Sequence, residues 1–369
     1  IKGLSELCEQ AQVKPDEIEL IVHGTTVATN ITLEHNGAEV GMITTRNFRD
    51  ILHIGRHKRP HNFSLHFDVP WQSRALVKRR NRIPVTERIM PPTGEVETPL
   101  NENEVLEAVA LFKKRGIESV VIGFLFSFLN DSHERQARAI VEQEMPGVFV
   151  CTSSDVANVL REYERFSTAV LNGALLTVVD AYLDRFAAEV ARLGVPAEPK
   201  ISQSSGGLMS VHMTRKLPIR ACLSGPAAGV LGAAQRAPAA GFNNVITLDV
   251  GGTSADVSVL IDGAATEVHN RMLAGFPLRL PALDVNAVGA GGGSIAWIDV
   301  DGLLKVGPQS SGANPGPVCY GLGGIDATLT DANVLLGRLN DRALLDGRMQ
   351  IRRDLAEAAI GRLAEELGL

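Results

Sequence analysis

The fold class depends most on the run Thr247-Leu-Asp-Val-Gly-Gly-Thr-Ser-Ala-Asp-Val-Ser-Val-Leu-Ile-Asp-Gly263. Apolar residues lead into a glycine pair, and after it Val257, Val259 and Ile261 recur at every second position, which is the period of a β-strand. The run therefore predicts two strands joined by a tight glycine turn. Because Gly-Gly is also common in ordinary hairpins, the pattern alone leaves a plain structural hairpin open.

The residues around this turn have the chemistry of a loop that binds phosphate and a metal ion. Paired glycines let the backbone approach a ligand closely and direct N–H groups toward an anion. The hydroxyls of Thr253 and Ser254 add donors, and a carboxylate such as Asp249 at the end of a strand can hold a hydrated Mg²⁺. We therefore favour a phosphate–metal loop over a plain hairpin.

Composition sets the class of protein. A chain of 369 residues is long enough for about two domains. Its 36 Lys+Arg and 42 Asp+Glu give a net charge of −6, which disfavours nucleic acid or an anionic membrane as a partner. We expect no membrane span, because no apolar run reaches about 18 residues. We expect no signal peptide, because no charged segment followed by an apolar one opens the chain. We expect a cytoplasmic protein, because the four cysteines are scattered: Cys8, Cys151, Cys222 and Cys319.

The chain divides into two parts with different textures. Residues 1–200 alternate strands and helices, and residues 201–369 are rich in glycine, so we expect an α/β domain followed by a second domain. In the first part the patterns predict strands over 18–24, 38–45 and 119–128, helices over 25–35 and 158–193, a helix from Asn101 to Gly116, and a helix capped by Asp131. The chain opens on a helical pattern with no initiator methionine, so we expect a fragment.

A second glycine cluster is the run Val288-Gly-Ala-Gly-Gly-Gly-Ser-Ile295. It nearly matches the dinucleotide fingerprint G-x-G-x-x-G, but Ser294 stands where the last glycine is required. The residues that follow read as a strand, whereas the fingerprint opens a helix. We therefore expect a backbone surface that meets a nucleotide or another subunit, with a purely packing role as the alternative.

Two further runs have the form of a strand followed by the start of a helix. In Leu223-Ser-Gly-Pro-Ala-Ala-Gly-Val230, Ser224 is a candidate N-cap, and a helix N-terminus attracts anions. In the run from Ile21 to Asn30, His23, Thr25 and Thr26 are expected at the end of the strand. For both runs a structural cap is the alternative, and for the second this alternative is favoured on local pattern alone.

Two charged segments are candidate functional sites, but both are disfavoured. His53, His57, His61 and His66 lie close in sequence, but Pro60 interrupts the helix that would align the first three as metal ligands, so a metal site is disfavoured.

The other segment, Arg161-Glu-Tyr-Glu-Arg165, has partners at helical spacing and is predicted to be a solvated helical turn. No Walker A sequence, no H-E-x-x-H and no G-x-S-x-G is present, and we find no nucleophile triad.

Taken in order, these runs resemble the hydantoinase A/oxoprolinase family of the actin-like ATPase superfamily. The matching runs are His23–Asn30, Gly41–Arg46 with Phe48–Asp50, Ile54–Arg56 with Arg59–Pro60, Arg161–Arg165, Gln203–Gly207, Leu223–Gly229, Asp249–Asp256, Val288–Ser294, and Gly307–Gln309 through Pro315–Pro317 to Tyr320–Gly321. They cover nearly the whole chain.

The resemblance implies an α/β fold of two ribonuclease-H-like domains, with mixed sheets flanked by helices. Both domains are expected to be incomplete, because the family's first Asp-x-Gly-Gly-Thr hairpin and the end of its second domain are absent. The family implies ATP and Mg²⁺, the ATP-dependent opening of a cyclic amide (a hydantoin, 5-oxoproline or a lactam), and a B-type partner subunit in a hetero-oligomer. The alternatives are a subunit of an ATP-dependent ketone carboxylase and a non-catalytic nucleotide-binding module.

Carried over by position, the resemblance implies roles for particular residues. Asp249 is the expected magnesium-side carboxylate, Asp256 orients metal-bound water, and His23 touches substrate or phosphate. The expected nucleotide contacts are Gly251, Gly252, Thr253, Ser254, Gly291, Gly292, Gly293, Thr25 and Thr26.

Overall fold

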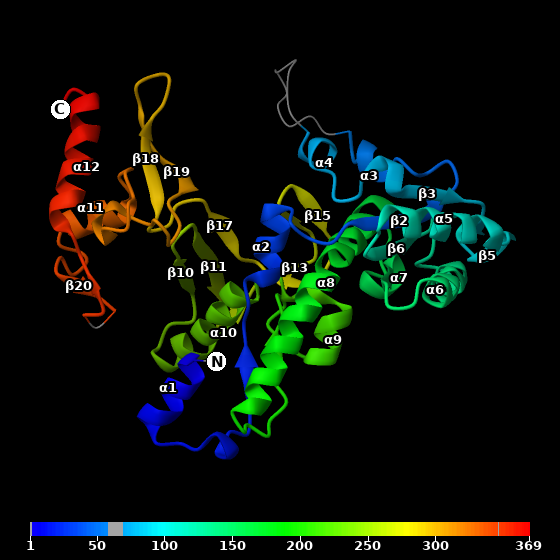
Figure 1. Cartoon of the computed structure of the whole chain (residues 1–369), viewed down its shortest axis with the longest axis horizontal. Coiled ribbons are helices and arrows are strands. Elements are labelled where there is room, and N and C mark those ends of the chain that lie inside the picture. The colour runs from blue at the N-terminus through cyan, green and yellow to red at the C-terminus, as the bar shows by residue number, and fades with distance from the viewer. Residues whose placement is uncertain (1, 58–68, 346) are drawn as a thin grey trace. The chain divides into compact units, whose positions relative to one another are not determined.

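The computed structural model describes residues 2–57, 69–345 and 347–369, which form two compact units (Figure 1). Unit 1 comprises Ile1–Ala228 and Glu267–Leu283, and unit 2 comprises Gly229–Thr266 and Asp284–Leu369. Residues 201–228 belong with unit 1, where the helix Val211–Lys216 and the 3-10 turn Pro218–Ala221 pack against the long helix of that unit. The domain limits predicted above, 1–200 and 201–369, stay a prediction.

Unit 1 is the helix-rich part of the chain. Its helices are α1 (Lys2–Ala11), α2 (Val27–Glu34), α3 (Ile51–Ile54), α4 (Pro70–Ser73), α5 (Glu102–Arg115), α6 (Ser132–Glu144), α7 (Ser153–Val156), α8 (Glu162–Arg192) and α9 (Val211–Lys216), with short 3-10 turns η1 (Pro15–Glu17), η2 (Arg79–Asn81) and η3 (Pro218–Ala221). Its strands are β1 (Val22–His23), β2 (Val40–Thr45), β3 (Arg82–Val85), β4 (Arg88–Met90), β5 (Glu95–Thr98), β6 (Ser119–Gly123), β7 (Phe149–Thr152), β8 (Lys200–Ser202), β9 (Leu208–Ser210), β13 (Glu267–Val268), β14 (Arg271–Leu273), β15 (Phe276–Leu278) and β16 (Ala282–Leu283).

Unit 2 is built mainly from antiparallel strands. Its strands are β10 (Val245–Val250), β11 (Ala255–Ile261), β12 (Ala264–Ala265), β17 (Asn286–Val288), β18 (Ser294–Ile298), β19 (Leu304–Ser310), β20 (Ala343–Leu344) and β21 (Met349–Gln350). Its helices are α11 (Leu329–Leu335) and α12 (Arg353–Glu366), with the turn η4 (Val318–Tyr320), and α10 (Ser224–Ala239) begins in unit 1 and continues into unit 2.

A four-stranded parallel sheet of unit 1 has the order β3-β2-β6-β7 and is covered by helices on both faces. Successive side chains of a strand point to opposite faces. Met42 and Val121 accordingly join the core formed with α8, while Ile43 and Ile122 join the core formed with α5 and α6. A strand buried on both faces reads as a continuous apolar run, which is why the strand predicted over 38–45 is confirmed.

The ends of α5 and α6 can be compared with the cap residues predicted from the sequence. The Asn101 side chain accepts a hydrogen bond from the Glu104 amide at 3.3 Å, and Gly116 ends α5 with a positive φ of 63°, as predicted. Asp131 occupies the N-cap position of α6, but its side chain makes no capping hydrogen bond there. Its carboxylate pairs instead with Arg135 at 2.9 Å, one turn further along the helix, so the predicted cap is wrong in mechanism.

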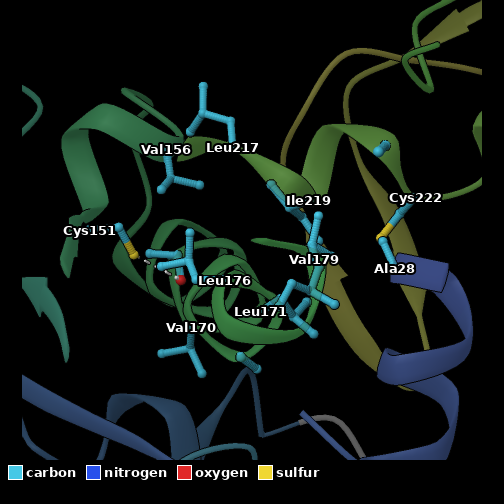
Figure 2. Close-up of a cluster of buried hydrophobic side chains, with 14 of the residues drawn as sticks. Ala28, Cys151, Val156, Val170, Leu171, Leu176, Val179, Leu217, Ile219 and Cys222 are labelled. Atoms are coloured by element: carbon cyan, nitrogen blue, oxygen red, sulfur yellow. Dashed lines mark hydrogen bonds between the residues drawn. The ribbon is translucent and has the colours of Figure 1, made fainter. Parts of the chain in front are cut away.

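The core of unit 1 is organised around α8, a helix of 31 residues that confirms the helix predicted over 158–193. Figure 2 shows Val170, Leu171, Leu176 and Val179 of this helix among buried side chains from α2, β7, α7 and the 217–222 segment. By length and composition alone α8 is apolar enough to cross a membrane, but 72% of its most apolar window is buried within the protein. A core helix passes the same test, so this is weak support for a membrane span.

The charged turn at the start of α8 is only partly exposed, and the prediction that it is solvated is wrong for Arg165. Arg161 is exposed and Glu162 and Glu164 are half-buried, but Tyr163 and Arg165 are buried. Arg165 is 0% exposed, and its guanidinium donates to the Phe124 carbonyl at 2.5 Å, to the Ser153 hydroxyl at 3.0 Å and to the Val159 carbonyl at 3.3 Å. These acceptors come from the ends of β6 and β7 and from the segment before α8. Arg165 therefore satisfies backbone groups that would otherwise be buried without partners.

In unit 2 the run from 245 to 261 forms the predicted strand, turn and strand. β10 and β11 pair antiparallel, and β12 and β17 both pair with β11. One face of the hairpin is exposed. Its aliphatic side chains expose 46–71% of their surface: Ile246, Leu248, Val250, Val259 and Ile261. The alternation predicted from sequence is therefore present, but these apolar positions are on the exposed face.

Candidate functional site

The register of the β10–β11 hairpin places two carboxylates directly opposite each other. Asp249 pairs with Asp256, one step before the turn, where Val250 pairs with Ala255. Side chains of directly opposed residues lie on the same face with Cβ atoms about 4.5–5.5 Å apart. Like charges opposite each other repel, so a cation bound between the two carboxylates would stabilise this arrangement.

The turn between the strands leaves backbone donors open. The Gly251 amide donates to the Ser254 carbonyl at 2.9 Å and closes the turn. Within the described part of the chain, the amides of the exposed residues Gly252 and Thr253 donate no hydrogen bond. Two successive free N–H groups beside a carboxylate pair are suited to contact phosphate oxygens.

The structure brings the two glycine clusters together. The Gly292 amide donates to the Gly251 carbonyl at 2.9 Å, and the Gly293 amide donates to the Gly252 carbonyl at 2.6 Å. A Cβ on Gly291 would lie 2.6 Å from the Ser254 nitrogen, so only glycine fits there. The close backbone approach gives these glycines a packing role, and their contact with a nucleotide stays a prediction. β18 follows directly, so the cluster opens a strand and not the helix that a dinucleotide fingerprint requires.

The donor set at the hairpin fits magnesium better than a transition metal. The described residues contain no group of three or more His, Cys, Asp or Glu side chains able to hold a metal ion. Mg²⁺ is usually held by one or two carboxylates together with waters and substrate phosphates, so it does not need such a group. The pair Asp249 and Asp256, next to open backbone donors, meets that requirement.

The other predicted site residues lie in unit 1, where the turn between β1 and α2 meets the start of α10. The 3-10 turn η3 precedes α10, so the strand predicted before Leu223 is wrong. The Thr25 amide donates to the Ser224 hydroxyl at 3.3 Å, and the Leu223 amide donates to the Thr29 hydroxyl at 2.9 Å. Thr25 is buried, and its own hydroxyl accepts from the Val27 amide at the start of α2. Thr26 is exposed and keeps its hydroxyl outside this network.

His23 belongs to a different set of contacts from Thr25. Its Nε2 lies 2.5 Å from the Tyr182 hydroxyl, and its ring stacks on Phe186 with centroids 4.5 Å apart. Burial lowers the pKa of this imidazole from its ordinary value, which favours the neutral form near neutral pH. Sequence reasoning missed Tyr182 and Phe186. The available signal was their i,i+4 spacing, which puts both rings on one side of the predicted helix.

The suggested histidine cluster is only partly within the described residues. His53 lies in α3 and His57 just beyond it, whereas His61 and His66 lie outside the described residues. The metal interpretation of this cluster therefore stays untested.

Comparison with known proteins decides the family. Residues 1–145 match the model of the hydantoinase/oxoprolinase N-terminal region, and residues 165–369 match the hydantoinase/oxoprolinase model. The chain belongs to the hydantoinase/oxoprolinase family. The family predicted from the ordered motifs is thus confirmed, and so is the mixed α/β fold class.

Relatives in this family include enzymes of two kinds. The chain is 38% identical to the caprolactamase subunit alpha of Pseudomonas jessenii over 374 residues, covering 100% of this chain and 53% of the relative. The crystal structure of the ATP-dependent caprolactamase from the same organism matches with a TM-score of 0.80 and 37% identity, covering 100% of this chain and 54% of that one. The acetophenone carboxylase gamma subunit of Aromatoleum aromaticum is 33% identical, covering 95% of this chain and 50% of the relative. The chain thus spans about half the length of these hydantoinase/oxoprolinase relatives.

Proposed function

We propose that this chain is part of an ATP-dependent amidohydrolase that couples ATP hydrolysis to the opening of a cyclic amide. The observation that carries the proposal is the opposed pair Asp249 and Asp256 beside the open amides of the glycine turn, in a member of the hydantoinase/oxoprolinase family. The likeness to an ATP-dependent caprolactamase supports ATP as the co-substrate. The substrate is a hydantoin, 5-oxoproline or a lactam.

The chemistry explains why ATP is needed. Amide resonance makes direct attack of water on the carbonyl carbon slow. Phosphorylation of the amide oxygen converts it into a leaving group and makes the carbon more electrophilic. In this proposal the Gly252 and Thr253 amides hold the phosphates, with Gly251 and Ser254 shaping the turn. Mg²⁺, when bound at Asp249, would neutralise phosphate charge, and Asp256 would orient metal-bound water.

The remaining predicted residues contact the nucleotide or the substrate in this proposal. Gly291, Gly292 and Gly293 line the nucleotide site through their backbone, in addition to their packing against the turn. Thr26 is the more exposed of the two threonines, so its hydroxyl is the one available to a ligand, whereas the hydroxyl of the buried Thr25 accepts from the Val27 amide. His23 contacts the substrate.

The assembly and compartment are also part of the proposal. The two relatives described above are named as subunits alpha and gamma of larger enzymes. We infer a hetero-oligomer with a B-type partner subunit, located in the cytoplasm.

The decisive experiment removes one charge at the hairpin. Asp249→Asn in the full-length protein with its partner should lower Mg²⁺-dependent, cyclic-amide-stimulated ATP turnover on the order of 10²-fold or more. Asp262→Asn is the matched control, because Asp262 is an exposed aspartate at the other end of β11. Unchanged turnover in Asp249→Asn would show that the site assignment is wrong.

A second candidate is a subunit of an ATP-dependent ketone carboxylase, favoured by the likeness to the acetophenone carboxylase subunit. In that case ATP turnover would require bicarbonate and a ketone in place of a cyclic amide. Tight Mg-ATP binding with no turnover under either condition would identify a non-catalytic nucleotide-binding module.

A further inference from the structure

A cavity in unit 1 lies between α1, β1 and the second half of α8. Its volume is about 620 Å³, and it contains His23. Leu4, Leu7 and Ile21 contribute apolar surface, and Tyr182 and Phe186 contribute aromatic surface. The cavity therefore combines a mainly apolar lining with a small number of polar groups, which is the usual composition of a small-molecule site.

The aromatic rings that line the cavity lie in nearly parallel planes. Tyr182 and Phe186 are four residues apart on α8, and their ring planes differ by only 2° with centroids 6.4 Å apart. The His23 ring lies against Phe186 with an interplanar angle of 27°. Offset stacking of flat rings is favourable, so these aromatic rings suit a flat ligand better than a bulky aliphatic one.

The polar groups can both donate and accept. The 2.5 Å contact between His23 Nε2 and the Tyr182 hydroxyl uses one ring nitrogen. Nδ1 makes no hydrogen bond within the described residues and takes the complementary role: it donates when the tyrosine donates to Nε2, and accepts when the tyrosine accepts. The pair thus matches an amide group, which carries one N–H and one C=O.

Among the residues that line the cavity, Arg185 carries a positive charge. Glu189 accepts from Arg192 at 2.7 Å, so its charge is balanced. In the part of the chain that the structure describes, no carboxylate pairs with Arg185, and its Nε donates only to the Ala181 carbonyl at 3.3 Å. Arg185 is therefore available to a ligand carboxylate.

We propose that this cavity binds the ring of the cyclic amide, with the ring against Phe186 and the amide group at His23 Nδ1. Arg185 receives the carboxylate of a substrate such as 5-oxoproline. The inference rests on the proposed function and adds the place where the substrate ring lies. An adenine base is also flat and carries adjacent donors and acceptors, so the test must separate it from a cyclic amide.

The test measures binding by isothermal titration calorimetry on the full-length protein with its partner, using hydantoin, 5-oxoproline and adenosine. Phe186→Leu should weaken hydantoin binding about threefold to tenfold, because the aromatic ring is lost while most of the side-chain volume is kept. Arg185→Gln should weaken 5-oxoproline and leave hydantoin unchanged. Phe242→Leu is the control, since Phe242 is 65% exposed and lies in unit 2.

Outcomes of this experiment separate the cavity from the proposed function. If hydantoin binds and stimulates ATP turnover equally in the wild type and Phe186→Leu, the cavity assignment is overturned while the function stands. Weakened adenosine binding with unchanged hydantoin binding would also overturn it, because the flat ligand would then be the nucleotide base. Absence of any cyclic amide binding to the wild type overturns both. Equal unfolding midpoints of the wild type and Phe186→Leu show that the variant is folded.

Discussion

Replacing Gly291 by alanine tests whether the ligand-free protein needs a glycine at this position for the second glycine cluster to pack against the hairpin turn. The added methyl carbon would lie 2.6 Å from the Ser254 nitrogen and 2.7 Å from the Gly251 carbonyl oxygen. Both are backbone atoms, so neither can rotate away, and one of the two loops must move. Overpacking of this kind costs about 1–3 kcal/mol.

Moving the loops also strains the two hydrogen bonds that join them, from the Gly292 and Gly293 amides to the hairpin turn. Each contributes about 1 kcal/mol, so we expect Gly291→Ala to lower the free energy of unfolding by about 3–5 kcal/mol in all. Equilibrium unfolding in urea measures this as a lower midpoint at an unchanged slope.

The matched control is Gly252→Ala on the other side of the contact. No atom lies within 4 Å of a Cβ added at Gly252, and its φ is not positive, so stability should change by less than about 0.5 kcal/mol. If Gly252 faces phosphate, the same variant should weaken Mg-ATP binding. A Gly291→Ala protein that unfolds at the urea concentration of the wild type would refute the packing argument.

Two further predictions concern the buried carboxylate of Asp331 and the half-buried imidazole of His23. The fully buried Asp331 carboxylate accepts hydrogen bonds from the backbone amides of Val318, Cys319 and Thr328 and from the Thr328 hydroxyl, so in Asp331→Asn an amide nitrogen faces a donor. We expect a loss of about 1–3 kcal/mol in urea unfolding, and a variant as stable as the wild type would contradict this. For His23, burial places the folded-state pKa below the ordinary 6.5, so the unfolded chain takes up protons first and stability falls as the pH drops below that value. When the pH is lowered from about 7.5 to about 5.5, the free energy of unfolding should therefore fall less in His23→Gln than in the wild type. Urea denaturation at the two pH values measures this, and an equal fall in the two proteins would contradict the prediction.

The hairpin and its neighbours show how far sequence reasoning reaches. The glycine pair between two alternating runs was enough to predict the β10–β11 hairpin, because turn chemistry and strand period are local properties. The register that opposes Asp249 and Asp256 follows from the same turn. Which face of the hairpin is covered was not predictable, since it depends on elements distant in sequence.

Arg165 shows why local spacing misleads at buried positions. Its sequence neighbours offer ion-pair partners at helical spacing, which favours a solvated turn. Its actual acceptors, at Phe124, Ser153 and Val159, come from backbone and side chains that only the folded sheet brings to it. A buried arginine therefore needs tertiary partners that periodicity cannot reveal.

The contact of His23 with Tyr182 joins residues 159 positions apart, so no local pattern contains it. The ordered family motifs pointed to His23, but Tyr182 and Phe186 stand outside those motifs. The candidate site was thus predictable where turns and motifs define it, and not where one element packs against another.

The length of α8 has a mechanical consequence for unit 1. At 1.5 Å per residue its 31 residues span about 46 Å, and an α-helix of this kind resists bending. Its first turn is anchored by Arg165, its middle by the Asn172 side chain at Lys216, and its second half carries Tyr182. Tyr182 lies about 25 Å along the axis from Arg165, so a tilt of about 5° at the anchored end displaces it by about 2 Å. A rigid helix of this length would therefore transmit a tilt at the sheet edge to Tyr182, and so to the cavity around His23.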